Sequence, residues 1–144
     1  MKESIPGWLV VHLIFLVVAY GSVLILDFIG LLWLIGRLGR EKMLKLTAWA
    51  QPVIWTGLIG MLISGAMLGP DIARPLTRVK MGLVIALALN GLNLDALRAR
   101  TKQLSEQSFW GSPNSYKAWS IVSILLSQAL WISIVVVAAM NSAD

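Results

Sequence analysis

The chain has 144 residues, of which 58% are hydrophobic and 13% are charged, and its mean hydropathy is +0.79. This composition leaves too little polar surface for a soluble globular domain and indicates an integral membrane protein. The absence of cysteine excludes disulfides, thiolate metal sites and thiol nucleophiles. The net charge of +5 comes from Lys and Arg grouped between apolar segments, which is typical of membrane topology and not of a nucleic-acid-binding face.

Four apolar segments are long enough to cross a hydrocarbon core of about 30 Å, which takes about 20 helical residues. They lie near 8–35, 46–68, 76–97 and 118–140. The first segment begins like a signal peptide, but it runs beyond the roughly 7–15 apolar residues of a signal core, so we expect a retained helix. The sequence therefore predicts an all-α fold, a single four-helix transmembrane domain over residues 1–144.

Basic residues are unevenly distributed between the two expected ends of the bundle. The loop after the first segment and the polar stretch after the third together carry Arg37, Arg40, Lys42, Lys45, Arg98, Arg100, Lys102 and Lys117. The opposite end carries Lys2, Arg74, Arg78 and Lys80. Because basic residues favour the cytoplasmic side, we expect a multi-pass protein of the cell inner membrane with both termini outside. The stretch 103–116 is then a cytoplasmic loop, partly ordered by Phe109 and Trp110 at the membrane interface.

The first segment carries two ionisable side chains among apolar neighbours, His12 and Asp27. At about 100° per residue both fall on one helical face, which we expect to point into the bundle because charge is costly against lipid. In the third segment, Lys80 and Asp95 repeat the same spacing on one face. The match indicates a repeat of two helices plus two, although the second and fourth segments do not align.

The polar residues divide by depth into two layers. The outer layer contains His12, Ser64 and Lys80, with Met61, Met67 and Met81 nearby. The inner layer contains Asp27, Asn90, Asn93, Asp95 and Gln128. Asp27 is the strongest functional candidate, because it lies too deep to be stable alone and has no neighbour of opposite charge in the sequence.

Each of the other polar residues also has a structural interpretation. Lys80 can extend its ammonium group to the outer interface, and Asp95 can lie at the cytoplasmic interface beside Arg98. Ser64, Asn90 and Gln128 can form hydrogen bonds between helices, and His12 can be a hydrogen-bonded residue that faces the headgroups.

The second segment has small and aromatic residues with their own predicted uses. Gly57, Gly60 and Gly65 give it a face on which another helix can pack closely. Trp55 and Trp131 of the fourth segment lie deeper than the other tryptophans. Packing in the bundle core is favoured over ligand contact for both residues.

Several short motifs resemble a known group of proteins. They are the histidine and aspartate of the first segment, Trp55-Thr56-Gly57-Leu58, Ser64-Gly65, Lys80-Met81 and Asn90-Gly91. Over roughly residues 8–95 the pattern resembles small bacterial four-helix integral membrane proteins of unassigned function. It is more faintly similar to copper resistance D-type membrane proteins and to haem-carrying four-helix cytochromes, which generally supply paired histidines. This chain has a single histidine, so bis-histidine haem ligation within one chain is excluded.

The function class that we favour is an intramembrane site that binds or passes a small ligand, namely haem b, copper, or another small molecule or ion. Its expected ligand-binding residues are His12, Asp27, Ser64, Lys80 and Asn90. Its expected metal ligands are His12 with Met61, Met67 or Met81, because imidazole with a thioether suits Cu(I) and haem iron. Two His12 side chains of a homodimer are the alternative way to ligate haem.

The second function class is a non-catalytic accessory or scaffold subunit of a larger membrane complex. The third class, an enzyme, is not favoured unless it is a haem oxidoreductase. The sequence has no Ser/His/Asp order, no HExxH motif and no phosphate loop. The expected partners are therefore the lipid bilayer, with a second copy of the chain or a larger membrane complex, and no nucleic acid.

Overall fold

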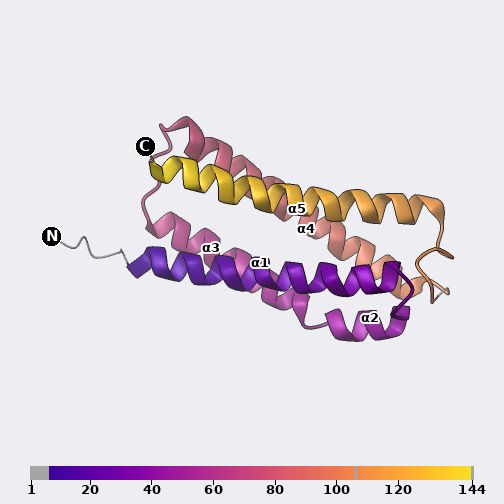
Figure 1. Ribbon diagram of the computed structural model, residues 1–144. Helices are drawn as coiled ribbons and strands as arrows, with labels where there is room; N and C mark the ends of the chain where they lie inside the picture. Colours follow the sequence, from indigo (N-terminus) through magenta and orange to yellow (C-terminus); the bar gives the residue numbers. More distant parts are fainter. Residues whose placement is uncertain (1–6, 106, 144) are drawn as a thin grey trace.

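The structure is a computed structural model that describes residues 7–105 and 107–143, and helices are the regular elements of this part of the chain (Figure 1). They are α1 (Gly7–Leu34), α2 (Arg40–Thr47), α3 (Ala50–Met67), α4 (Pro75–Gln103) and α5 (Asn114–Ala143). Four stretches are long and apolar enough to cross a membrane, because α2 and α3 count as one such stretch. The predicted all-α bundle is therefore confirmed, and its four long helices have the length and apolar character that a membrane span requires.

The helix bounds differ from the prediction at the end where the basic residues gather. The span predicted near 76–97 continues to Gln103, and the span predicted near 118–140 already begins at Asn114. A separate helix, α2, precedes α3. These additions are rich in polar residues, which hydropathy assigns to loops. A helix can continue past the hydrocarbon core because its charged side chains then reach water or headgroups.

The bundle is built from two antiparallel helix pairs, α1 with α3 and α4 with α5 (Figure 1). We call them the first and second hairpin. α1 and α3 approach closely at Gly57, where an added Cβ would lie 2.6 Å from the Cβ of Ala19. Gly60 meets the ring of Phe15 in the same contact. The predicted packing face of glycines is therefore present on α3.

The end of the bundle near α2 has an apolar cluster of its own, formed by Trp33, Met43, Leu97, Phe109 and Tyr116. Phe109 is only 3% exposed. Phe109 thus orders the loop before α5 by packing inside the cluster, and its position at the membrane interface stays a prediction. The indole of Trp33 fixes this loop by donating to the carbonyl of Gln107 at 2.8 Å.

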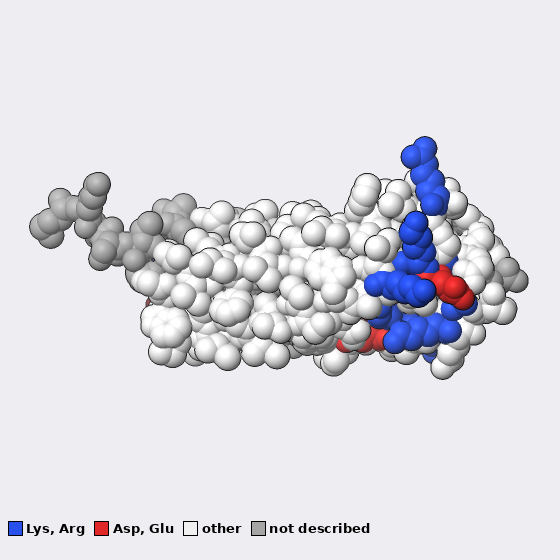
Figure 2. All heavy atoms as spheres, turned by 90° about the horizontal axis from the view of Figure 1, so that it is seen from below, with Lys and Arg blue, Asp and Glu red and all other residues white. Residues whose placement is uncertain are grey.

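Lys and Arg side chains gather at the same end of the molecule, and the long flank of the bundle in this view is largely free of charge (Figure 2). The loop after α1 and helix α2 contribute Arg37, Arg40, Lys42 and Lys45 to this end. An uncharged flank is what lipid contact requires. The basic end is the one that the sequence predicts to face the cytoplasm.

Candidate functional site

A cavity of about 560 Å³ lies between the two hairpins. Side chains from all five helices line it, and most of them are apolar. Small-molecule sites typically have volumes of roughly 300–1,000 Å³ and combine apolar walls with a few polar groups. The cavity therefore has the size and the wall composition of a ligand site.

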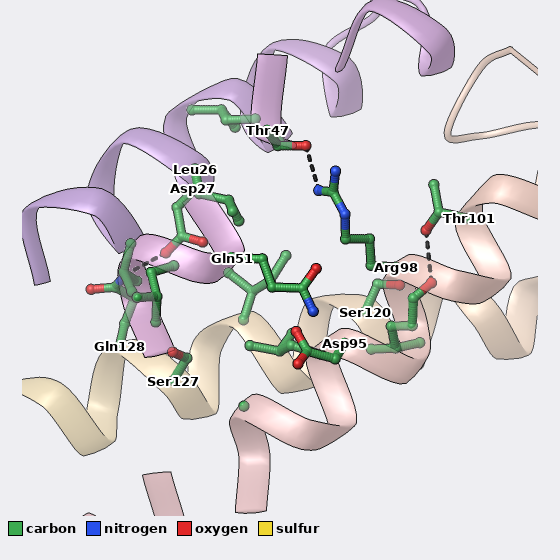
Figure 3. A pocket seen from close by; sticks show the side chains of 18 of the residues that line it. Leu26, Asp27, Thr47, Gln51, Asp95, Arg98, Thr101, Ser120, Ser127 and Gln128 are labelled. Atoms are coloured by element: carbon green, nitrogen blue, oxygen red, sulfur yellow. Dashed lines mark hydrogen bonds between the residues drawn. The ribbon is translucent and has the colours of Figure 1, made fainter. Parts of the chain in front are cut away.

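Polar side chains reach this cavity from both hairpins (Figure 3). The first hairpin contributes Asp27 and Gln51, and the second contributes Asp95, Arg98 and Gln128. Within the described residues, Asp27 and Asp95 are the acids of the cavity wall and Arg98 is its one Lys or Arg. Of the inner layer predicted from the sequence, Asp27, Asp95 and Gln128 line this cavity, whereas Asn90 and Asn93 do not.

Asp27 is held by a hydrogen bond from the opposite hairpin. The side-chain Nε2 of Gln128 on α5 donates to Oδ2 of Asp27 (Figure 3). The hydroxyl of Tyr20 donates to Oε1 of Gln128 at 3.3 Å. The Tyr20 ring in turn stacks on Trp131, with 5.2 Å between centroids. These contacts fix the orientation of the Gln128 amide, so that its N–H points at the carboxylate.

Asp95 shows the same arrangement in the reverse direction. Its Oδ2 accepts a hydrogen bond of 2.9 Å from the indole Nε1 of Trp55, which belongs to α3. Each acid is therefore bound by a neutral N–H group from the other hairpin. Trp55 has a polar role that the sequence did not reveal, since packing was the interpretation favoured for it.

Arg98 directs its guanidinium group towards Thr47 (Figure 3). Its Nη1 donates to Oγ1 of Thr47 at 2.6 Å, and its Nη2 donates to the carbonyl of Leu44 at 3.0 Å. These bonds tie α4 to α2. The hydrogen bonds that Asp27 and Asp95 make within the described chain come from neutral donors.

Ser120 adds an unsatisfied polar group to the cavity wall. The residue is 8% exposed and lines the cavity, yet its Oγ has no hydrogen-bond partner among the described residues. A buried polar group without a partner costs about 1–3 kcal/mol. A water molecule or a polar atom of a ligand in the cavity would remove this cost.

His12 lies outside this cavity, in the contact between α1 and α3. Its Nδ1 is 3.1 Å from the carbonyl oxygen of Met61 and 3.1 Å from Oγ of Ser64. A carbonyl oxygen can only accept, so Nδ1 carries the hydrogen and Nε2 keeps its lone pair in the neutral ring. The hydroxyl of Ser64 donates to the carbonyl of Gly60 at 2.6 Å. The structure therefore brings His12 and Ser64 together, as members of a packed helix contact.

The other residues predicted for the outer layer are dispersed. The side chains of Met67 and Met81 are 55% and 47% exposed, so they lie on the outside of the bundle, whereas Met61 is buried. No group of three or more His, Asp or Glu able to hold a metal ion occurs in the described part of the chain. His12 offers one imidazole nitrogen. The arrangement of the methionines around it gives no support for a haem or copper site.

Asn90 joins the two helices of the second hairpin. Its Nδ2 donates to the carbonyl of Ser123 at 3.0 Å, and Nδ2 of Asn93 donates to Oγ of Ser123 at 2.8 Å. Asn90 does not line the cavity. Its contact corresponds to the interhelical hydrogen bond that the sequence offered as the structural interpretation.

The sequence missed the part that Arg98, Thr47 and Ser120 play in the cavity. Arg98 follows Asp95 by three residues and thus lies on the same face of α4. That spacing was the available signal, but the charge of Arg98 was attributed to membrane topology. Thr47 and Ser120 carry no signal of this kind in the sequence.

Compared with known protein families, curated proteins and solved structures, the chain matches none. The resemblance to small bacterial four-helix membrane proteins stays a prediction. The function must therefore be argued from the cavity and its residues.

Proposed function

We propose that this chain is an integral membrane protein that binds a small ligand in the cavity between its two hairpins. The observation that carries the proposal is the combination, in one space of about 560 Å³, of apolar walls with Asp27 and Asp95. Ionisable residues at membrane depth are costly and most often mark a ligand or ion pathway. Here both acids also face a volume large enough to hold a ligand.

The cavity favours ligand binding over a purely structural role as an accessory subunit. Unfilled space inside a bundle loses packing energy, so a protein that only serves as a scaffold gains stability by filling it. Three residues of the cavity wall, Leu24, Leu31 and Leu125, are also 48%, 50% and 64% exposed on the outer surface. Exposed side chains thus form part of the cavity wall, which supports entry of a ligand that is dissolved in the membrane.

We place the protein in the cell inner membrane with α2 on the cytoplasmic side and both termini outside. The gathering of basic side chains at the α2 end supports this orientation (Figure 2). The chain has no cysteine, so a single introduced cysteine reports one position. Ile72→Cys, in the loop between α3 and α4, should react with an impermeant thiol reagent in intact cells, whereas Ser105→Cys should not. Labelling of Ser105→Cys alone would reverse the orientation.

Blocking the cavity tests the binding proposal. Gly30 lines the cavity, and an added Cβ there meets nothing within 4 Å, so Gly30→Phe places a ring in open space. Gly21 is the matched control on the same helix, because an added Cβ is equally free but the residue does not line the cavity.

Photolabelling of the purified protein with a small phenyldiazirine reads out access to the cavity. We expect adducts on Asp27 and Asp95 in the wild type and in Gly21→Phe, and their loss in Gly30→Phe. Adducts that are absent from the wild type, or equal in both variants, would contradict the proposal.

A further inference from the structure

The charges of the cavity point to the class of ligand, an inference that rests on the proposed function. We propose that the cavity takes a lipophilic organic cation, meaning an apolar body that carries one positive charge. The argument has four parts: the balance of charge, the aromatic walls, the unpaired hydroxyl of Ser120 and the opening towards lipid.

The cavity holds more negative than positive charge. Its wall carries two carboxylates, Asp27 and Asp95, and one guanidinium, Arg98, so one negative charge is in excess when both acids are ionised. The N–H groups of Arg98 are bound by Thr47 and Leu44. Each acid receives its hydrogen bond from a neutral amide or indole. A buried carboxylate without a cation is unfavourable, and a cationic ligand supplies the missing charge.

The aromatic residues of the wall suit the same ligand. They are Trp33, Trp55, Phe109, Tyr116 and Trp131. Trp55 is the half-buried member of this set, so its ring is the one most open to a ligand, whereas the other four are buried. A cation near an aromatic face is attracted by the negative side of the ring, and the attraction is larger where water is excluded. Binding sites for organic ammonium ions use such faces together with acidic groups. The described residues contain no group of three or more His, Cys, Asp or Glu that could hold a metal ion.

Ser120 is an independent indication that a ligand occupies this space. The residue is more than nine-tenths buried, lines the cavity, and its Oγ lacks a partner in the described chain. A polar atom held in the cavity would satisfy this hydroxyl, as would the carbonyl of Tyr116 one turn earlier in α5. The exposed leucines at the cavity wall leave a route from the bilayer, where lipophilic cations concentrate and simple hydrated ions do not.

Two probe ions of the same shape and opposite charge test the inference. Tetraphenylphosphonium and tetraphenylborate have the same four phenyl rings, so a difference between them reports the sign of the charge that the cavity prefers. Equilibrium dialysis of the detergent-solubilised protein should show saturable binding of tetraphenylphosphonium, with at least about tenfold weaker binding of tetraphenylborate.

The acids are tested with substitutions that keep their size. Asp27→Asn and Asp95→Asn remove the charge but retain an oxygen that can accept from Gln128 or Trp55. Each should weaken tetraphenylphosphonium binding by about tenfold, and the double variant should abolish it. Asp71→Asn is the matched control, because Asp71 lies in the exposed loop between α3 and α4, outside the cavity. Its binding should equal that of the wild type.

The outcomes separate this inference from the proposed function. If tetraphenylborate binds as tightly as tetraphenylphosphonium, or if the double variant keeps its affinity, the preference for cations is wrong. The ligand site itself then still stands if Gly30→Phe abolishes binding of either ion. If neither ion binds while the diazirine labels the cavity, the cation class is again wrong and the proposed function survives. If neither ion binds and no cavity labelling occurs, both proposals fail.

Discussion

The contact around His12 and the cavity around Asp27 lie on the same helix, yet they differ in how their polar groups are used. His12 is bound by α3 within the first hairpin, where glycines let the two helices touch. Asp27 is bound by α5 of the second hairpin and faces open volume. A shared helical face therefore does not give two ionisable residues the same role. The neighbouring helix decides whether such a residue joins two packed surfaces or lines a site.

The second hairpin also has an acid that faces the cavity, but among the described residues it has no counterpart of the His12 contact. Asp95 faces the cavity and is bound across the gap by Trp55 of the first hairpin, as Asp27 is bound by Gln128 of the second. α1 and α4 run in the same direction (Figure 1). The repeat of two helices plus two stays a prediction.

Overfilling the packed contact should have the largest effect on stability. Gly57→Leu adds a side chain where even a Cβ would lie 2.6 Å from Ala19, so α1 and α3 must separate. We expect a loss of about 3 kcal/mol or more in unfolding free energy, measured by thermal unfolding in detergent. Gly82→Leu is the control, because an added Cβ there meets nothing within 4 Å. Equal melting temperatures for both variants would show that this contact is not tightly packed.

Removing the hydrogen-bond acceptor at the cavity should lower the unfolding free energy by less than Gly57→Leu does. Asp27→Leu leaves the amide of Gln128 without its partner, and a buried unsatisfied group costs about 1–3 kcal/mol. Asp27→Asn keeps an acceptor oxygen and should melt near the wild type. If Asp27→Leu is as stable as Asp27→Asn, the hydrogen bond across the hairpins contributes nothing to the fold.

Loss of the imidazole should lower the unfolding free energy by less than the two changes above, and it should leave the cavity intact. His12→Ala removes the hydrogen bond to the carbonyl of Met61, a change of about 1 kcal/mol. Diazirine adducts on Asp27 and Asp95 should be unchanged, because His12 does not line the cavity. Altered labelling would mean that the two regions are coupled.

An absorption spectrum of the same sample tests the haem prediction, since haem bound at His12 gives a Soret band that this substitution removes.

The smallest effect is expected within the second hairpin. Asn90→Ala removes the bond to the carbonyl of Ser123, and interhelical side-chain bonds in membranes contribute about 0.6 kcal/mol on average. The change in melting temperature should be smaller than for His12→Ala, with binding at the cavity retained. A loss of ligand binding would assign Asn90 the site role that the sequence proposed for it.

The sequence was most informative where lipid imposes a single requirement. Apolar length and helical periodicity identified the membrane spans and the inward face of α1, since both depend only on the cost of polar groups against hydrocarbon. The ends of α4 and α5 were missed because beyond the hydrocarbon core helix and loop have similar composition.

The site was predicted only in part, for a physical reason. The depth of Asp27 marked it as a functional candidate, and the structure places it in the wall of a cavity. A sequence without contacts between distant helices cannot show that Gln128 and Trp55 bind the two acids. The outer layer joined His12 with Met67 and Met81 by depth alone. Depth does not fix the rotation of a helix about its axis, and rotation determines which side chains meet.

The most direct test of the central claim is native mass spectrometry of the protein released from membrane extracts. The account predicts one non-lipid small molecule per chain in the wild type and in Gly21→Phe, and none in Gly30→Phe, where the cavity is filled. The same bound species in Gly30→Phe, or its absence from all three proteins, would contradict the claim that the space between the hairpins is a ligand site.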